Sequence, residues 1–303
     1  MDESPAAPAV EAHGLVKGFG ATRAVDGVDL VVPAGSIYGV LGPNGAGKTT
    51  TLRILLGIID PDAGERRILG HADPFAVAEQ VGYLPEERGL YPGMTACDAI
   101  AFLGALRGLS LEEGRRRASA LLARHDLPPE RPIRTLSKGQ AQLVQLLGTI
   151  VHRPRLVVLD EPFSGLDAIN QERLEETIRA EAAQGATILF STHVIAHAER
   201  MCERVAIIAG GRVRFEGAVE EARARLPACV RLGTRAAEGP WQAALPADAV
   251  KEAGLWRFAL PEGGIEPLLT ALIEGEAGIE TLAIERPSLH DAFVAIVGEG
   301  DVA

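Results

Sequence analysis

The sequence is poor in positive charge, and lysine is almost missing from it. Four of its 303 residues are lysine. The 30 Lys and Arg residues are outnumbered by 41 Asp and Glu residues, so the formal net charge at pH 7 is −11. Proteins that bind nucleic acid irrespective of its sequence neutralise phosphates with basic side chains. We therefore expect no direct nucleic-acid partner.

Cysteines and long apolar runs are also scarce. The three cysteines are Cys97, Cys202 and Cys229, and their odd number and wide spacing argue against a disulfide framework and a cysteine-rich metal site. No run approaches the about 18 apolar residues of a membrane-spanning helix. The acidic N-terminus lacks the basic and apolar segments of a signal peptide. We expect a protein of the reducing cytoplasm that does not cross a membrane by itself.

The first two-thirds of the chain alternate between strand and helix patterns. Residues 1–9 are predicted to be a loose tail. Short apolar runs predict strands at 28–32, 37–41, 156–159, 186–190 and 205–208. Helical patterns are found at 48–56, 95–127, 139–152, 170–183 and 193–201, and prolines end the second of them. This alternation predicts an α/β fold around a parallel sheet.

The composition shifts after Gly217, and residues 218–303 are predicted to form a small, separate α+β domain. Strand patterns occur at 229–232, 255–260 and 279–284, and helical patterns occur at 218–226, 265–273 and 288–297. Ser288, followed three residues later by Asp291, predicts a helix cap. Trp241 and Trp256 are expected to belong to the core of this domain.

A glycine-rich loop stands between the strand pattern 37–41 and the helix pattern 48–56. It reads Gly42-Pro43-Asn44-Gly45-Ala46-Gly47-Lys48-Thr49-Thr50 and fits the pattern G-x-x-x-x-G-K-[ST]. Glycines let successive backbone N–H groups point at one anion, and the helix N-terminus adds positive charge. The loop therefore predicts a phosphate-binding site, with Lys48 on the β- and γ-phosphates and Thr49 on Mg²⁺.

Two adjacent carboxylates, Asp160 and Glu161, follow the apolar run 156–159. At the carboxyl end of a buried strand, Asp160 can hold Mg²⁺ directly or through water. Glu161 is then placed to polarise an attacking water. Together with the glycine-rich loop, this pair of carboxylates predicts a nucleoside triphosphate as the substrate.

Three further motifs complete a series in a fixed order. Leu136-Ser137-Lys138-Gly139-Gln140 precedes the carboxylates, Ser164-Gly165-Leu166-Asp167 follows them, and His193 comes last. With these motifs, residues 10–217 resemble the ATP-binding cassette (ABC) family. The resemblance implies a P-loop NTPase fold, with a mixed sheet on a RecA-like core and a helical subdomain at about 87–150. The small α+β domain at 218–303 would be an accessory domain.

The resemblance also implies roles for individual residues. Glu161, His193 and Lys48 would be catalytic, and Mg²⁺ would be held by Thr49, Asp160 and Glu86. Residues that would bind ATP are Phe19, Gly42, Pro43, Asn44, Gly45, Ala46, Gly47, Lys48, Thr49, Thr50, Glu86, Ser137, Gly139, Gln140 and Asp167. Phe19 stands where the family usually stacks an aromatic ring on adenine. Ser137, Gly139 and Asp167 resemble the motifs that act across a dimer, so a second copy is implied.

Two departures from the family pattern point to a branch. Glu86 stands where glutamine is usual, and Lys138 stands where the signature usually has glycine. The segments 83–92 and 161–167, with the ending 286–293, resemble ATPase subunits of ABC-2 type exporters, which include drug and sodium efflux systems. The resemblance implies an ATPase on the inner face of the cell membrane, paired with permease subunits on separate chains.

Two other functions remain open from the sequence. One is a soluble ABC ATPase that acts on a macromolecular assembly, such as one for cofactor assembly. The other is a regulatory subunit that binds ATP without hydrolysing it, although the presence of both Glu161 and His193 argues against it. The transported substrate is not encoded in any motif of this chain.

Overall fold

A computed structural model describes residues 7–87, 89–252 and 254–298. The chain divides into two compact units. One contains the residues up to Val219 and those from Val297 onward, and the other is Glu220–Ile296. Most of the predicted tail, residues 1–6, lies outside the described residues.

A six-stranded sheet organises the first unit. Its order is β5-β6-β7-β3-β8-β9, and all neighbours are parallel except β8 and β9. The strands are β3 (Ile37–Leu41), β5 (Val81–Leu84), β6 (Leu156–Asp160), β7 (Thr187–Thr192), β8 (Arg204–Ala209) and β9 (Arg212–Ala218). Strands β6 and β7 are buried along their whole length, as expected of parallel strands covered on both faces. The α/β fold predicted from the sequence is confirmed.

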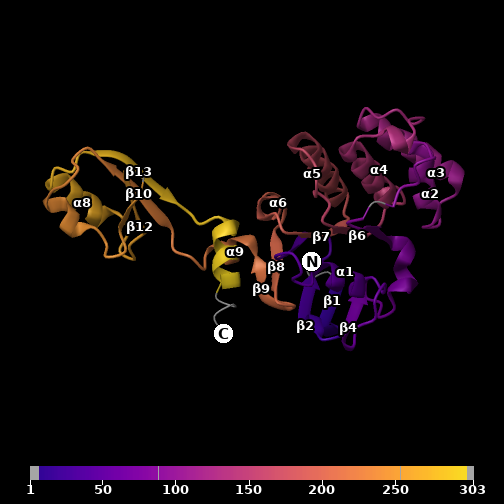
Figure 1. The fold of residues 1–303 in the computed structure, drawn as a ribbon, viewed down its shortest axis with the longest axis horizontal. Coiled ribbons are helices and arrows are strands. Elements are labelled where there is room, and N and C mark those ends of the chain that lie inside the picture. The colour runs from indigo at the N-terminus through magenta and orange to yellow at the C-terminus, as the bar shows by residue number, and fades with distance from the viewer. Residues whose placement is uncertain (1–6, 88, 253, 299–303) are drawn as a thin grey trace, which may run out of the picture. The chain divides into compact units, whose positions relative to one another are not determined.

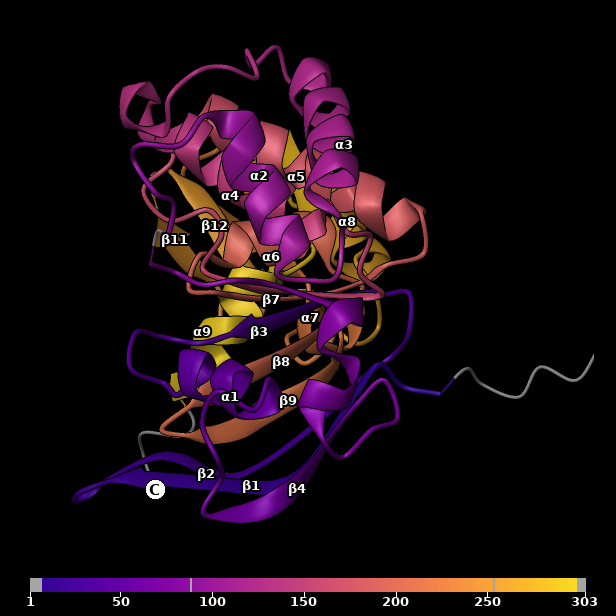
Figure 2. The same cartoon turned by 90° about the vertical axis from the view of Figure 1, so that its right-hand side faces the viewer.

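A second, antiparallel sheet has the order β2-β1-β4. Its strands are β1 (Val10–Phe19), β2 (Thr22–Val32) and β4 (Ala63–Ile68). Helix α1 (Lys48–Leu55) lies between the two sheets and packs on β1 and β2 on one side and on β6 on the other (Figure 2). Its buried residues Leu52, Ile54 and Leu55 join both sheets into one core. This packing fixes the start of α1 against the end of β3.

Helices cover the opposite face of the six-stranded sheet. Helices α5 (Ala168–Ala183) and α6 (Ile195–Met201) pack on β7, and α6 also contacts β3. Helix α4 (Lys138–Ile150) contacts α5 and carries α2 (Ala96–Ala105) and α3 (Leu111–Arg124) (Figure 1). Among the described residues, we find no helix with both the length and the apolarity needed to span a bilayer.

The continuous helical segment predicted at 95–127 was wrong, because the structure contains two helices there. Gly108 adopts a left-handed backbone with φ of 91° between them. Ser110 then caps α3, since its side chain accepts from the backbone N–H of Glu113. Short 3₁₀ turns in this unit are η1 (Pro74–Gln80) and η2 (Ile133–Thr135).

The second unit is a four-stranded antiparallel sheet with the order β11-β12-β10-β13. Its elements are β10 (Cys229–Thr234), η3 (Pro240–Ala244), β11 (Val250–Glu252), β12 (Leu255–Ala259), α8 (Glu266–Glu274) and β13 (Ile279–Glu285). Trp241 is buried and meets Trp256 edge-to-face at 6.1 Å, in a core that α8 completes. The division between the units falls within α7 (Val219–Arg223) and α9 (Leu289–Gly298). Ser288 and Asp291 exchange the predicted capping hydrogen bonds at the start of α9.

Candidate functional site

The glycine-rich loop leaves β3 and turns directly into α1. Gly47 caps the helix in a left-handed conformation, with φ of 101°. A Cβ atom at Gly47 would lie 2.2 Å from the carbonyl oxygen of Ala24, and one at Gly42 would lie 2.3 Å from that of Ile208. Lys48 is buried, and its Nζ donates to the carbonyl oxygen of Gly42 at 2.8 Å. The ammonium group is therefore held over the loop that the helix N-terminus makes attractive to anions.

Asp160 ends β6 beside the start of α1. Its Oδ1 accepts from Thr49 Oγ1 at 3.0 Å and from Ser191 Oγ at 2.6 Å. Its Oδ2 is buried and has no hydrogen-bond partner among the residues that the structure describes. An unpartnered buried carboxylate oxygen is costly, and a hard cation is the partner that such an oxygen and a threonine hydroxyl suit. The Thr49 hydroxyl and the Asp160 carboxylate therefore fit a Mg²⁺ ion, which they would hold beside the glycine-rich loop.

Glu161 lies at the centre of a charged cluster. Its Oε1 is 3.3 Å from Lys48 Nζ, and its Oε2 is 2.9 Å from His193 Nδ1. Its backbone N–H donates to Ser191 Oγ at 3.1 Å. The φ angle of Glu161 is 48°, a left-handed conformation that non-glycine residues seldom adopt and that surrounding contacts must hold. The carboxylate is thereby aimed at the glycine-rich loop.

Lys48, Thr49, Glu161 and His193 line one open cavity of about 550 Å³, and the predicted residues Gly42, Pro43 and Asp160 are not among its lining residues. Its lining residues are Ala24, Asn44, Gly45, Ala46, Gly47, Lys48, Thr49, Thr50, Glu86, Glu161, Ser164 and His193. Residues that the sequence placed in one site are thus brought together from β3, α1, β6 and the segments after β5 and β7. Glu86 is exposed at the cavity wall, so its carboxylate is accessible there. Ala24, Ser164 and Ser191 were not predicted as site residues.

The signature residues occupy a different place, around the N-terminus of α4. Ser137 and Gln140 exchange side-chain and backbone hydrogen bonds there in a capping box. Asp167 caps α5 and also binds the amide of Asn170, which lies against Gly139. These hydrogen bonds from Asn170 hold the pKa of Asp167 below its usual value. The predicted residues Ser137, Gly139, Gln140 and Asp167 are absent from the lining of the phosphate cavity.

Phe19 stands at the end of β1, and its side chain is 52% exposed. Lys17 Nζ lies 5.9 Å from the centre of its ring. The phenyl ring is therefore a surface group with an open face, although it does not line the phosphate cavity. Its predicted contact with adenine stays a prediction.

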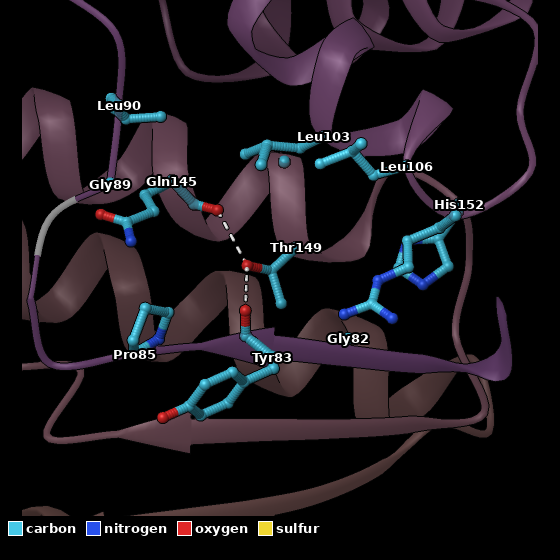
Figure 3. A pocket seen from close by; sticks show the side chains of 12 residues that line it. Gly82, Tyr83, Pro85, Gly89, Leu90, Leu103, Leu106, Gln145, Thr149 and His152 are labelled. Atoms are coloured by element: carbon cyan, nitrogen blue, oxygen red, sulfur yellow. Dashed lines mark hydrogen bonds between the residues drawn. The ribbon is translucent and has the colours of Figure 1, made fainter. Parts of the chain in front are cut away.

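A second cavity of about 200 Å³ lies beneath the helices (Figure 3). Leu103 and Leu106 form one wall, Tyr83 and Pro85 form the wall opposite, and His152 lies at one end. Thr149 joins the two sides, because its hydroxyl lies 3.0 Å from the carbonyl oxygen of Gln145 and 3.5 Å from that of Tyr83. The cavity thus connects α2 and α4 to the segment that leads from β5 to Glu86.

The histidine in this second cavity makes the stability of the fold depend on pH. Burial, reinforced by the charge of Arg107, lowers the pKa of His152 to about 4. The unfolded chain therefore binds more protons than the folded chain between pH 6.5 and pH 4, and stability falls as the pH falls through this window. We expect His152→Gln to reduce the slope of melting temperature against pH between 7.5 and 5. His13→Gln, at an exposed site, serves as the control, and an equal effect there would contradict the assignment.

Comparison with known proteins places this arrangement in a family. The family model described as "ABC transporter" matches residues 25–164. The uncharacterized ABC transporter ATP-binding protein YhaQ of Bacillus subtilis is 35% identical over 94% of this chain and 97% of its own length. The daunorubicin/doxorubicin resistance ATP-binding protein DrrA of Streptomyces peucetius is 33% identical over 96% of this chain and 92% of its own. The Nod factor export ATP-binding protein I of Ralstonia nicotianae is 36% identical over 71% and 68%.

Solved structures give the same result for the fold. A structure described as the ATP binding subunit of an ABC transporter superposes with a TM-score of 0.65 at 33% identity, covering 71% of this chain and 92% of that one. The cbiO1 protein of Clostridium perfringens gives 0.64 at 25% identity, covering 72% and 91%. None of these names favours the alternative of a soluble ATPase. The motifs, the fold and the relatives agree, and the chain belongs to the ATP-binding subunits of ABC transporters, a family of ATPases.

Proposed function

We propose that this chain hydrolyses ATP in the cavity around Lys48 and that two copies drive an exporter whose permease subunits are separate chains. The observation that supports it most is the convergence of Lys48, Glu161 and His193 on the phosphate-binding loop. Phosphoryl transfer needs positioning and electrostatic stabilisation more than covalent chemistry from the protein. A cavity in which one carboxylate lies within hydrogen-bonding distance of an ammonium group and of an imidazole supplies both.

Each residue of the cavity has a task in this proposal. The backbone N–H groups of the loop and Lys48 bind and orient the phosphates of ATP. Glu161 accepts a hydrogen bond from the attacking water and aligns it with the γ-phosphate. His193 binds the γ-phosphate, and its contact with Glu161 links the water to the phosphate. A Mg²⁺ ion held by Thr49, Asp160 and Glu86 would neutralise charge on the β- and γ-phosphates.

A second copy of the chain completes each site. The position of Ser137, Gly139, Gln140 and Asp167 outside their own phosphate cavity supports this part of the proposal. One chain then holds the phosphates on its glycine-rich loop, and the signature helix of its partner covers the γ-phosphate with its N-terminus. Phe19 stacks on adenine through the open face of its ring.

The second cavity is proposed as the docking place for a permease segment. Leu103 and Leu106 give it an apolar wall, and Leu106 is 64% exposed. A movement of the segment 86–92 on ATP binding would be transmitted to Thr149 and Gln145 of α4, and from there to the rest of the helical subdomain at about 87–150. Export as the direction of transport rests on the names of the relatives, DrrA and the Nod factor export protein. Residues 218–303 are proposed as an accessory domain.

Co-purification from the host cell tests the transporter part of the proposal. The tagged chain is recovered from membranes solubilised in mild detergent, and its partners are identified. We expect a multi-spanning membrane protein in stoichiometric amount, together with two copies of this chain. Leu106→Glu is expected to abolish this recovery by placing a charge in the docking cavity, while Leu111→Glu, at an exposed position of α3, leaves it intact. Recovery with soluble partners only would overturn the transporter assignment.

A further inference from the structure

Glu175, His197 and Arg200 form a hydrogen-bonded cluster that joins α5 to α6 and does not line the phosphate cavity. Glu175 on α5 is 5% exposed and His197 on α6 is 2% exposed. His197 Nδ1 lies 2.8 Å from Glu175 Oε1, and Arg200 donates to the same oxygen. A carboxylate only accepts hydrogen bonds, so His197 donates to Glu175 in the tautomer that carries the proton on Nδ1, and Arg200 Nη2 lies 3.0 Å from the same nitrogen. The imidazole ring is thereby fixed in one orientation.

Glu175 is held in its charged form within this cluster. Burial by itself would raise its pKa, but hydrogen bonds from Arg200 and His197 outweigh burial and keep the pKa below its ordinary value. Hydrogen bonds to a charged acceptor are stronger than neutral ones. Glu175 is therefore a firm anchor for the ring of His197.

The anchored ring stacks on Phe163. The two ring centres are 4.1 Å apart, and the ring planes are inclined by 19°. Phe163 is buried and also meets Phe190 of β7 edge-to-face, with the ring centres 5.9 Å apart. Phe163 lies two residues after Glu161, so the stack acts on the turn that carries the proposed water-orienting carboxylate.

That turn needs contacts that hold it. Glu161 has a φ of 48°, and such a backbone persists only where the surroundings determine it. Ser191 accepts the N–H of Glu161 from β7, and Gln142 on α4 donates to the carbonyl oxygen of Pro162 at 3.1 Å. The stack on Phe163 supplies a further fixed point, from α6. Asp167 caps α5, and α6 begins at Ile195, two residues after His193, so both helices of the cluster continue from loops of the site.

We propose that His197, oriented by Glu175, is a positioning residue that holds Glu161 in its productive conformation through the ring of Phe163. This inference rests on the role proposed for Glu161. The imidazole does not touch the substrate, and its contribution is the placement of the turn. A misplaced turn would leave ATP binding intact, since the phosphates are held by the loop and Lys48.

Two replacements of His197, one that keeps an aromatic ring and one that removes it, test the stacking on Phe163. We expect His197→Ala to lower kcat for ATP hydrolysis about tenfold, because it removes the ring that fixes the turn. His197→Phe keeps a ring on Phe163 and should stay within about threefold of the wild-type kcat. Both variants should bind ATP with a Kd within about twofold of the wild type. The Kd is measured by nucleotide titration, and the melting temperature of each variant is recorded.

The matched control removes another partner of Glu175. Arg179 Nη2 lies 3.5 Å from Glu175 Oε2, and its side chain is 45% exposed. Arg179→Ala therefore disturbs the cluster without touching Phe163, and kcat should not change. Glu175→Gln keeps an oxygen acceptor for His197 and should also retain most activity, whereas Glu175→Ala should resemble His197→Ala. Equal loss of kcat in His197→Phe and His197→Ala, or an equal loss in Arg179→Ala, would overturn the inference.

A double-mutant cycle with Glu161→Gln separates this inference from the proposed function. If His197 acts through Glu161, adding His197→Ala to Glu161→Gln should leave the residual hydrolysis of radiolabelled ATP unchanged. A further tenfold loss in the double variant would overturn the inference alone. A wild-type rate in Glu161→Gln by itself would overturn the role of Glu161 and the inference together.

Discussion

Glu161→Gln should reduce ATP hydrolysis by about 10²–10⁴-fold, the range expected when a positioned acid–base group is removed. The glutamine side chain has the size of the original and can still contact His193. Its amide, however, is too weakly basic to polarise a water. ATP binding should be kept or strengthened, because one negative charge beside the triphosphate is lost. Phosphate release measures the first effect, and titration with a fluorescent ATP analogue measures the second.

The control for this variant makes the same chemical change at a distant surface position. Glu65 is exposed on β4 of the three-stranded sheet, and Glu65→Gln should leave both hydrolysis and affinity at the wild-type values. Hydrolysis at the wild-type rate in Glu161→Gln would show that another group orients the water. Loss of ATP binding would instead show that the carboxylate shapes the loop through its contact with Lys48.

Gly47→Ala should abolish tight ATP binding. The new Cβ would lie 2.2 Å from the carbonyl oxygen of Ala24, a contact that forces the backbone to move. The loop would then lose hydrogen bonds to charged phosphate oxygens, each worth about 1.5–3 kcal/mol. Two such bonds correspond to a rise in Kd of about 10²-fold or more. The same nucleotide titration measures the effect, under conditions in which the variant is folded.

Gly185 provides a matched control for Gly47. Its φ is 98°, against 101° for Gly47, but in the described part of the chain no heavy atom beyond its two chain neighbours lies within 4 Å of the position of its Cβ. Gly185→Ala therefore imposes a left-handed backbone on alanine without a clash, at a cost of about 1–2 kcal/mol of stability. Urea unfolding should show this loss, and ATP affinity should not change. If both variants bind ATP equally well, the close approach of Ala24 does not shape the loop.

The sequence was most informative where chemistry and local geometry coincide. A loop that binds phosphate needs glycine, lysine and threonine at fixed spacing, so Gly42, Lys48 and Thr49 could be identified without a structure. The structure brings Lys48, Thr49 and Glu161 to one cavity, and it places Asp160 within hydrogen-bonding distance of Thr49. Their catalytic and binding roles stay predictions until the variants are measured.

Residues whose role depends on strand register could not be identified in the same way. Ser191 lies opposite Asp160 because β6 and β7 pair in parallel with that register. The sequence does contain an indication for Ser191, because the apolar strand pattern before His193 ends in two hydroxyl residues, Ser191 and Thr192. The cluster of Glu175 and His197 had no such signal, because it forms only when α5 and α6 pack together. Nothing in the spacing of two polar residues 22 positions apart indicates that packing.

The break between α2 and α3 was missed although its signal was present in the sequence. Gly108 precedes Ser110, and Glu113 follows three residues later, which is the pattern of a helix start. Alanine, leucine and arginine on both sides keep a helical period across the break, so periodicity alone predicts one continuous helix. In the structure a new helix starts after Ser110, because the Ser110 side chain accepts the hydrogen bond of the Glu113 backbone N–H.

The signature residues at the start of α4 lie outside the cavity that contains Lys48. If each active site needs residues from two chains, the active species is a dimer. In dilute solution its concentration, and with it the rate of hydrolysis, would rise with the square of the chain concentration. A permease with two binding sites would hold two chains next to each other. Each chain would then meet the other at an effective concentration on the order of millimolar. If the proposed function holds, a free chain would be inactive because it is dilute, and a pair of chains bound to one permease would be active.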